Sequence, residues 1–445
     1  MALTRRQFVT GMVGAGVLAA GSGLLLSGCS QSDADSELIE ALKAIAPSAK
    51  INSLKVTDEQ IVSGYDFADA PNSDYFVLDR SYNLPIGCLV YQNSDRNACV
   101  LTHGEENNVL IRLAVLDLET GELTTILDRA VGHSSDFVIY DARSNSSVLA
   151  WVECDLSTGE WVVYAAVLMD TQLGTVVELD RGETDYDPPM LCVNDVTVYW
   201  TVMPDANGPA YLEDSFLKAA RVTGNIASNQ RVVYTSHGRM ITNPQASGGV
   251  ITIVPRVDTD TVRYQLTALD ANTDQIIAVS ILPSGLRVSD CVYVAGSFTF
   301  CIESNYTFAE GLRYYGTYED LGNEQFFHAN RVPASPAVFA NNCLMIKSTT
   351  NIVGFHIARE YSFILDKPND CADYGDLLAG CGAQNQLVVY TTIVNKTDAE
   401  KNTTQVRIYT AAAPETAAAA ATAAATTAAA ATAAAPAASA ASNSG

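Results

Sequence analysis

Between Tyr75 and Tyr409 the chain alternates short apolar runs with polar turns. The runs are rich in Val, Ile, Tyr, Phe and Thr, and Gly, Asn, Asp and Pro separate them. This pattern is typical of β-strands joined by tight turns. Helical periodicity occurs before these strands, where Ser36 precedes the sequence ELIEALKAI. We therefore expect one short amphipathic helix, with Ser36 as its N-cap, ahead of a long all-β region.

The expected strands recur in groups. Each group begins at a polar or proline-containing segment, continues with a strongly apolar second strand such as SVLAWVEC (147–154), and then has a third strand. The seven groups start at Pro85, Phe137, Pro188, Pro244, Cys291, Pro336 and Leu377. The spacings of 52, 51, 56, 47, 45 and 41 residues between these starts match the period of a propeller blade.

One strand-like segment, YFVLDR (75–80), precedes the first group, although it resembles the fourth strand TTILDR (124–129) that closes that group. The seventh group lacks such a strand, because it ends at its third, QVRIYT (405–410). A ring of blades has no open seam when one blade takes strands from both ends of the chain. The sequence therefore predicts an all-β, seven-bladed β-propeller of four-stranded antiparallel blades over residues 75–410, closed by an N-terminal strand. A pair of two-sheet sandwiches is the alternative.

The first residues read as an export signal. Arg5 and Arg6 precede a Gly/Ala-rich apolar run that ends at Cys29. TRRQFV resembles the twin-arginine consensus, and LSGC (26–29) resembles the lipobox of bacterial lipoproteins. This resemblance implies that residues 1–28 are removed and that Cys29 carries a diacylglyceryl anchor with palmitate-type chains. The protein would then sit on the extracytoplasmic face of the cell membrane. An uncleaved anchor is the alternative, but the apolar run is short for a span.

The regions that flank the predicted propeller differ from it in composition. Residues 29–74 are expected to form a lipidated tether and the short helix. Residues 411–445 contain 22 alanines among 35 residues, with Thr, Pro and Ser making up most of the rest. This low-complexity composition predicts a disordered tail. It resembles Ala/Thr/Pro tracts of actinobacterial envelope proteins, which implies either a glycosylated spacer or an inert extension.

Three of the group starts contain a proline after a polar segment: DYDPPM (185–190), ITNPQ (241–245) and PASPAVF (333–339). They resemble the blade starts of TolB-type exported propellers. That family has Asp-Gly in the turn after the first strand, where this chain has Asn194-Asp195, Gly248-Gly249 and Asn341-Asn342. The resemblance implies a propeller fold and a tendency to bind other molecules. It implies no reaction, because these families share none.

The charge of the chain limits its partners. The sequence has 26 Lys and Arg against 50 Asp and Glu. Cleavage before Cys29 would remove Arg5 and Arg6 and leave 24 − 50 = −26. Such a surface repels phosphate backbones, so we expect no nucleic-acid partner. We expect a monomer that contacts the membrane through its lipid.

Candidate binding residues lie at the starts of the first strands. Asp136, Asp187, Asp290 and Asp376 occur there, and in a propeller these positions face one mouth of the central channel. Four carboxylates at one mouth could hold Ca²⁺ or grip a cationic or sugar ligand. Alternatively, short Asp side chains at these positions build the turns. The segment His133-Ser134-Ser135-Asp136 invites a catalytic interpretation, but a turn between blades explains it more simply. We predict no catalytic residue and no metal set from side-chain spacing.

Nine cysteines remain after Cys29. Within CLVYQNSDRNAC and CVYVAGSFTFC, two pairs could lie opposite each other across hairpins, which predicts disulfides Cys88–Cys99 and Cys291–Cys301. Buried free thiols are the alternative. Taken together, the sequence favours a tethered propeller that serves as a binding or scaffold module for a protein, glycan or small molecule. The alternatives are an enzyme at the channel mouth, such as a calcium-dependent hydrolase or lyase, and a structural envelope component.

Overall fold

The computed structural model describes residues 31–55, 60–62, 75–92, 94–103, 110–132, 136–258, 262–305, 310–315, 325–329, 335–356 and 361–412. The predicted signal segment, Cys29, the alanine-rich tail and His133 lie outside these residues. The chain divides into two units, Met1–Ile45 and Ala46–Gly445. No helix in the described part of the chain is long and apolar enough to cross a membrane.

The described part of the first unit is one helix, α2 (Gln31–Ile45). The expected helix is confirmed, but it begins before Ser36, so the N-cap prediction is wrong.

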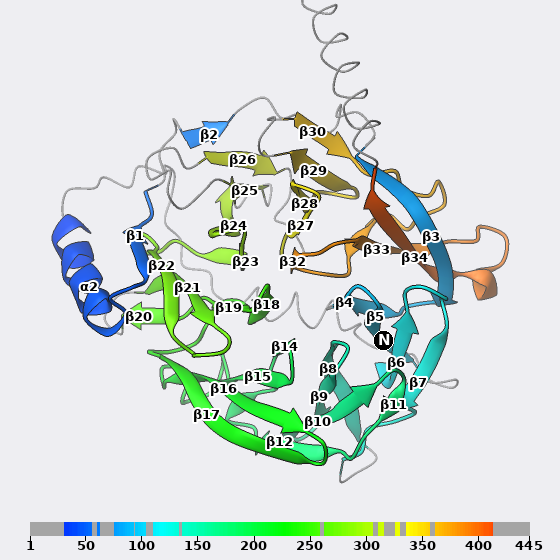
Figure 1. The fold of residues 1–445 in the computed structure, drawn as a ribbon, viewed down its shortest axis with the longest axis horizontal. Helices are drawn as coiled ribbons and strands as arrows, with labels where there is room; N and C mark the ends of the chain where they lie inside the picture. The colour runs from blue at the N-terminus through cyan, green and yellow to red at the C-terminus, as the bar shows by residue number, and fades with distance from the viewer. Residues whose placement is uncertain are drawn as a thin grey trace, which may run out of the picture. The chain divides into compact units, whose positions relative to one another are not determined.

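In the second unit, the described strands pair into seven sheets. Figure 1 shows the sheets of this unit arranged around a common centre. The first sheet contains β4 (Leu89–Gln92), β5 (Asn97–His103), β6 (Leu110–Asp117) and β7 (Leu123–Leu127). The second contains β8 (Phe137–Ser144), β9 (Val148–Asp155), β10 (Trp161–Met169), β11 (Gln172–Leu173) and β12 (Val177–Gly182). The third contains β13 (Tyr186–Asp187), β14 (Leu191–Asn194), β15 (Thr197–Pro204), β16 (Ser215–Thr223) and β17 (Ile226–Ser236).

The remaining sheets follow the same order along the chain. The fourth contains β18 (Gln245–Ser247), β19 (Val250–Ile253), β20 (Arg256–Asp258), β21 (Arg263–Asp270) and β22 (Ile276–Ile281). The fifth contains β23 (Val288–Val294), β24 (Ser297–Asn305), β25 (Glu310–Tyr315) and β26 (Gln325–Ala329). The sixth contains β27 (Val338–Ala340), β28 (Cys343–Lys347), β29 (Ile352–His356), β30 (Tyr361–Ile364) and β32 (Gly382–Ala383). The seventh contains β31 (Leu377–Leu378), β33 (Leu387–Ile393) and β34 (Thr403–Ala411), with the short helix η3 (Ala399–Lys401) before β34.

The strand predicted from YFVLDR closes the seventh sheet. This strand, β3 (Phe76–Pro85), pairs antiparallel with β34 from Phe76 opposite Ala411 to Pro85 opposite Thr403. Figure 1 shows the two strands side by side although they lie at opposite ends of the folded sequence. The predicted closure is confirmed, and the architecture is an all-β propeller.

Two further strands come from the region that was expected to hold only the tether and the helix. β1 (Lys50–Ser53) pairs parallel with β22, and β2 (Ile61–Val62) pairs parallel with β26. The sequence did not reveal them because short strands of this kind lack a clear alternation of apolar and polar residues. β1 and β2 pair with the last strands of the fourth and fifth sheets. Without them, those strands would be sheet edges with unpaired backbone N–H and C=O groups.

The core lies between neighbouring sheets. Trp161 and Trp200, at 1% and 0% exposure, pack with apolar residues of the second and third sheets in one buried cluster. Trp151, also fully buried, packs in the cluster between the first and second sheets. The tryptophans are therefore packing residues.

Both predicted disulfides are absent, and none of the nine cysteines after Cys29 takes part in a disulfide. The registers explain this result. Cys99 lies opposite Tyr91, and Cys301 lies opposite Asp290. The hairpin after β23 has a two-residue loop, so Cys291 is one position out of register with Cys301. A slip of one residue places two side chains on opposite faces of a sheet.

Candidate functional site

The four predicted carboxylates lie in different environments. Asp136 is exposed in the turn before β8, and Asp290 is buried within β23. Asp187 forms an ion pair with Arg239 at 2.6 Å. Within the described residues, no group of three or more His, Cys, Asp or Glu side chains could hold a metal ion. The structure therefore gives the predicted calcium site at this mouth no support.

Asp376 is a structural residue rather than part of an open mouth. Its side chain is fully buried, and its Oδ1 accepts a hydrogen bond of 2.5 Å from the Arg407 guanidinium on β34. Arg407 also donates to the carbonyl oxygen of Asp366 at 2.6 Å and to the Tyr409 hydroxyl at 2.8 Å. Burial raises the pKa of Asp376, and Arg407 counteracts part of that rise. The pair links the start of the seventh sheet to β34.

Asp187 has a similar role in the third sheet. Burial raises the pKa of its carboxyl group, and the neighbouring Arg239 guanidinium lowers it in part. Arg239 also hydrogen-bonds to the carbonyl oxygen of Pro204. These contacts join the segment after β17 to the strand pair β13–β15. They give Asp187 a part in holding two segments together.

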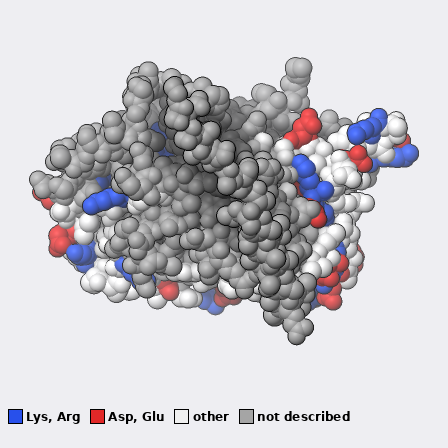
Figure 2. Space-filling model, turned by 90° about the horizontal axis from the view of Figure 1, so that it is seen from above, with Lys and Arg blue, Asp and Glu red and all other residues white. Residues whose placement is uncertain are grey.

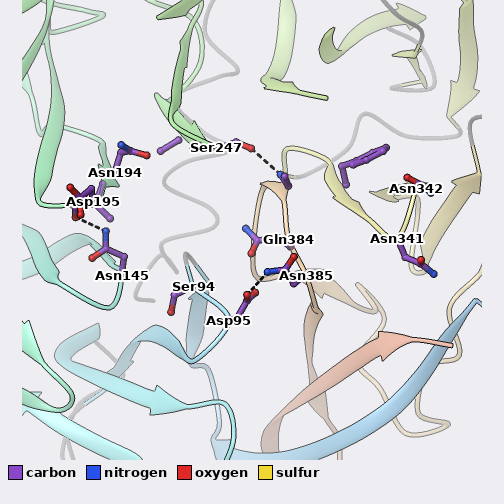
Figure 3. Close-up of a pocket in the computed structure, with 15 residues that line it drawn as sticks. Ser94, Asp95, Asn145, Asn194, Asp195, Ser247, Asn341, Asn342, Gln384 and Asn385 are labelled. Atoms are coloured by element: carbon purple, nitrogen blue, oxygen red, sulfur yellow. Dashed lines mark hydrogen bonds between the residues drawn. The ribbon is translucent and has the colours of Figure 1, made fainter. Parts of the chain in front are cut away.

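A pocket of about 550 Å³ lies at the other end of the first strands. Its lining comes from the turns after β4, β8, β14, β18 and β27 and from the segment before β33. Figure 3 shows these turns around a common space. The lining residues are Ser94, Asp95, Asn145, Val193, Asn194, Asp195, Ala246, Ser247, Gly248, Phe339, Asn341, Asn342, Ala383, Gln384 and Asn385. Pockets for small ligands have volumes in this range.

Tight hairpins position these side chains. The loops Gly248-Gly249 and Asn341-Asn342 each have positive φ at both residues, which is the type I′ geometry of two-residue hairpins. Asn tolerates positive φ better than other residues with a side chain. The sequence Asn341-Asn342 can therefore form the turn and also present two amides to the pocket, where glycine would present none.

One wall of the pocket is a segment that leaves the seventh sheet, residues 379–386, here called the crossing segment. The Ala379 carbonyl oxygen accepts from the Gln92 N–H of the first sheet at 2.8 Å. The Ala383 N–H donates to Ser247 Oγ of the fourth sheet at 2.9 Å. The Gln384 N–H donates to the Phe339 carbonyl oxygen of the sixth sheet at 3.0 Å. The crossing segment thus contacts the first, fourth and sixth sheets.

Hydrogen bonds hold several lining residues in place. Asn145 Nδ2 donates to the Asp195 carbonyl oxygen at 2.7 Å, which joins the turns of the second and third sheets. Asn385 Nδ2 donates to Asp95 Oδ2 at 2.5 Å, which joins the crossing segment to the first sheet. Figure 3 shows these two bonds in different parts of the pocket. Hydrogen bonds between different sheets therefore fix these parts of the pocket lining.

The pocket has a distinct charge character. Its lining contains six carboxamide side chains, two serines and two aspartates, and it contains no Lys, Arg or His. Elsewhere, on the side shown in Figure 2, the Lys and Arg side chains of the described residues lie among Asp and Glu side chains. The pocket is polar, with weakly negative character.

The sequence contained a signal for this pocket that we interpreted differently. Asn194-Asp195, Gly248-Gly249 and Asn341-Asn342 were identified as turns after the first strands, in place of Asp-Gly. The candidate site was placed instead at the starts of those strands. Sequence patterns show that both ends carry polar residues, but they do not show which end is hollow. The crossing segment was also missed, because its residues read as an ordinary loop.

Comparisons with known proteins identify no relative of this chain. No protein-family model matches the chain, and no curated protein matches it. Among solved structures, a prolyl endopeptidase has a TM-score of 0.47 and 12% identity over 71% of this chain, and the chain covers 46% of that protein's length. The β-propeller domain of the Trilobed protease from Pyrococcus furiosus has a TM-score of 0.41 and 9% identity, over 60% of this chain and 80% of that one. BamB from Moraxella catarrhalis has a TM-score of 0.35 and 10% identity, over 75% of this chain and 99% of that one.

All three TM-scores are below 0.5, so they carry no argument about function. The assignment of the fold therefore depends on the strand pairings of this chain. Its second unit is a β-propeller, closed by an N-terminal strand, with a polar pocket where the first strands end.

Proposed function

We propose that the protein is a lipid-anchored binding module that faces away from the cytoplasm. In this proposal each of the seven sheets is one blade, and the pocket holds a small ligand or an exposed group of a larger one. The observation that carries the proposal is the pocket of about 550 Å³, which turns of six sheets build together. Turns that only connect strands do not have to enclose a pocket of this size. A concave polar pocket with fixed side chains suits ligand binding.

The anchoring part of the proposal comes from the sequence. TRRQFV (4–9) and LSGC (26–29) resemble a twin-arginine signal and a lipobox. The twin-arginine route carries folded cargo. A propeller whose closing strands are Phe76–Pro85 and Thr403–Ala411 is complete only when the whole chain has been made, so export after folding suits it.

The anchor is tested by expressing the full chain in a bacterium that has a twin-arginine pathway. The wild-type protein is expected in the membrane fraction, with the lipid mass on Cys29. Cys29→Ala should release it from the membrane, and replacing both Arg5 and Arg6 by Lys should retain it inside the cell. Cys371→Ala is the matched control, because it removes a half-exposed thiol far along the sequence. An unlipidated wild-type protein in the soluble fraction would refute the anchor.

The binding part is tested with the purified propeller and the low-mass fraction of a cell-envelope extract. Native mass spectrometry should show an added mass on the wild-type protein. The added mass should be absent from Asn342→Trp, which fills the pocket from an exposed turn position. If both proteins gain the same mass, or neither gains any, the pocket is not the binding site.

A further inference from the structure

We infer that the pocket recognises a neutral, hydroxyl-rich ligand, with a saccharide as the chemical class. This inference rests on the proposed binding function and specifies its ligand. Six of the lining side chains are carboxamides: Asn145, Asn194, Asn341, Asn342, Gln384 and Asn385. A carboxamide has two N–H donors and one acceptor oxygen, and a hydroxyl group is both donor and acceptor. Several carboxamides around one space therefore match a ligand that carries many hydroxyl groups.

Some of the carboxamide groups already donate hydrogen bonds to the protein, and others can bind a ligand. Asn341 Nδ2 donates to the Tyr75 carbonyl oxygen at 3.3 Å, and Gln384 Nε2 donates to the Cys381 carbonyl oxygen at 2.9 Å. Within the part of the chain that the structure describes, the side chains of Asn194 and Asn342 make no hydrogen bond. Figure 3 shows Asn194 and Asn342 on different sides of the space. They can therefore contact one ligand from two directions.

Anionic ligands fit the lining poorly. Phosphate and carboxylate groups are normally bound by Arg or Lys side chains or by helix N-termini. The lining has no Lys, Arg or His, and it carries the carboxylates of Asp95 and Asp195. An anion would lose its hydration and meet these negative charges without compensation.

Cationic ligands are also disfavoured. Asp95 already accepts a hydrogen bond from Asn385. Figure 3 shows Asp95 and Asp195 in separate parts of the pocket. A bound Ca²⁺ would take six to eight oxygen ligands, usually with several carboxylates. Two separated carboxylates, one of them already engaged, do not form such a set.

A peptide is the main competing ligand. Peptide recognition generally uses an open sheet edge or apolar pockets for alternate side chains. The lining consists mainly of hairpin turns, such as those that join β14 to β15 and β27 to β28, and Phe339 is the one aromatic residue among the lining residues. A single aromatic face suits the apolar face of a sugar ring better than it suits a series of peptide side chains. The lining therefore favours a saccharide.

The test uses isothermal titration calorimetry and ligand-observed NMR on the wild-type propeller. The neutral probes are maltose and chitobiose. The anionic probes are glucose 6-phosphate and glucuronic acid, and tetra-alanine and CaCl₂ represent the other classes. We expect at least one neutral disaccharide to bind, with an affinity about tenfold lower in Asn194→Ala and in Asn342→Gly, which equals ~1.4 kcal/mol for each variant. Glycine at position 342 removes the amide and keeps the positive φ of the turn. Asn243→Ala is the control, because it removes an exposed amide at the start of the fourth group, away from the pocket.

The outcomes separate the ligand class from the proposed function. If an anionic probe, tetra-alanine or Ca²⁺ binds and the Asn194 and Asn342 variants weaken it, the saccharide inference is overturned while the pocket remains a binding site. If a saccharide binds equally well to all variants, the pocket is not its site. If no probe binds and the envelope extract adds no mass, both the inference and the binding function fail.

Discussion

The buried ion pair between Asp376 and Arg407 gives a quantitative prediction about the closure of the ring. Arg407 is 4% exposed and Asp376 is fully buried, so both charges have lost most of their hydration. Replacing Arg407 by Met keeps most of the side-chain volume but leaves the carboxylate without its cation. Removing one partner of a buried pair costs about 3–5 kcal/mol of folding free energy. The loss should therefore be large at pH 7.

The size of the effect can be expressed as a melting shift. The entropy of unfolding is about 2.1 cal/mol/K per residue, or about 0.7 kcal/mol/K for the roughly 340 residues of the propeller. A loss of about 3–5 kcal/mol then lowers the unfolding midpoint by about 4–7 °C at pH 7. Differential scanning calorimetry of the wild-type protein and Arg407→Met measures this shift directly.

The pH dependence provides a second, independent readout. Burial raises the pKa of Asp376, and loss of Arg407 raises it further. In the unfolded chain this carboxyl group titrates near pH ~4. An acid with a higher pKa in the folded state binds its proton more tightly there, so folding stability falls as the pH rises from that unfolded value through the folded one. The deficit of Arg407→Met should therefore be greatest at pH 7 and smaller near pH 4, where the carboxyl group becomes neutral.

Two controls make the prediction falsifiable. Arg181→Met removes an arginine from the exposed pair with Glu178 and should leave the midpoint almost unchanged. The double variant Arg407→Met with Asp376→Leu removes both charges and should recover much of the lost stability. The reasoning is refuted if Arg407→Met and Arg181→Met have the same unfolding midpoint. It is also refuted if Arg407→Met loses the same stability, relative to the wild-type protein, at pH 4 and at pH 7.

Three further predictions concern other parts of the ring. Gly382→Ala should melt at a lower temperature than Gly285→Ala, although both glycines have positive φ. A Cβ at Gly382 would lie 2.3 Å from Ser247 Oγ, whereas a Cβ at Gly285 would meet no atom within 4 Å. Equal midpoints of the two variants in calorimetry would contradict this contact. Glu153→Gln should lower the free energy of unfolding, measured in urea, by about 1.5–3 kcal/mol. The buried carboxylate accepts hydrogen bonds from two backbone N–H groups at 2.6 Å and from an indole N–H, and the amide nitrogen of glutamine would face such donors. The chain without its signal segment and with Cys29 blocked should show nine reactive thiols after unfolding without reductant; a count of five would restore the two predicted disulfides.

The periodic strand pattern predicted most of the fold. Apolar runs separated by turn residues located the strands, and the displaced segment YFVLDR located the closing strand, which pairs with β34 and completes the seventh sheet. The same pattern could not reveal β1 or β2. Their pairing uses backbone groups on sheet edges, which any short segment can supply.

The candidate site was harder to predict for a physical reason. An aspartate before a strand can face a ligand, build a turn or pair with a distant arginine, and the sequence gives no distance between Asp376 and Arg407 or between Asp187 and Arg239. The cysteine pairs failed similarly, because a one-residue difference in the hairpin after β23 moves Cys301 to the other face. Register and long-range pairing decide such sites, and both are set by packing rather than by local sequence.

The crossing segment affects the order in which the molecule can be completed during synthesis. It lies between β31 and β33 of the seventh sheet, and the pairing of Phe76 with Ala411 in that sheet joins residues 335 positions apart. Closing a flexible loop of that length costs about 5 kcal/mol in chain entropy before any contact compensates for it. Until residues 379–386 emerge from the ribosome, the other turns of the pocket exist without their shared wall. A ribosome-bound chain therefore carries an incomplete pocket, and the ligand recognition that we propose would begin only with the last part of the ring.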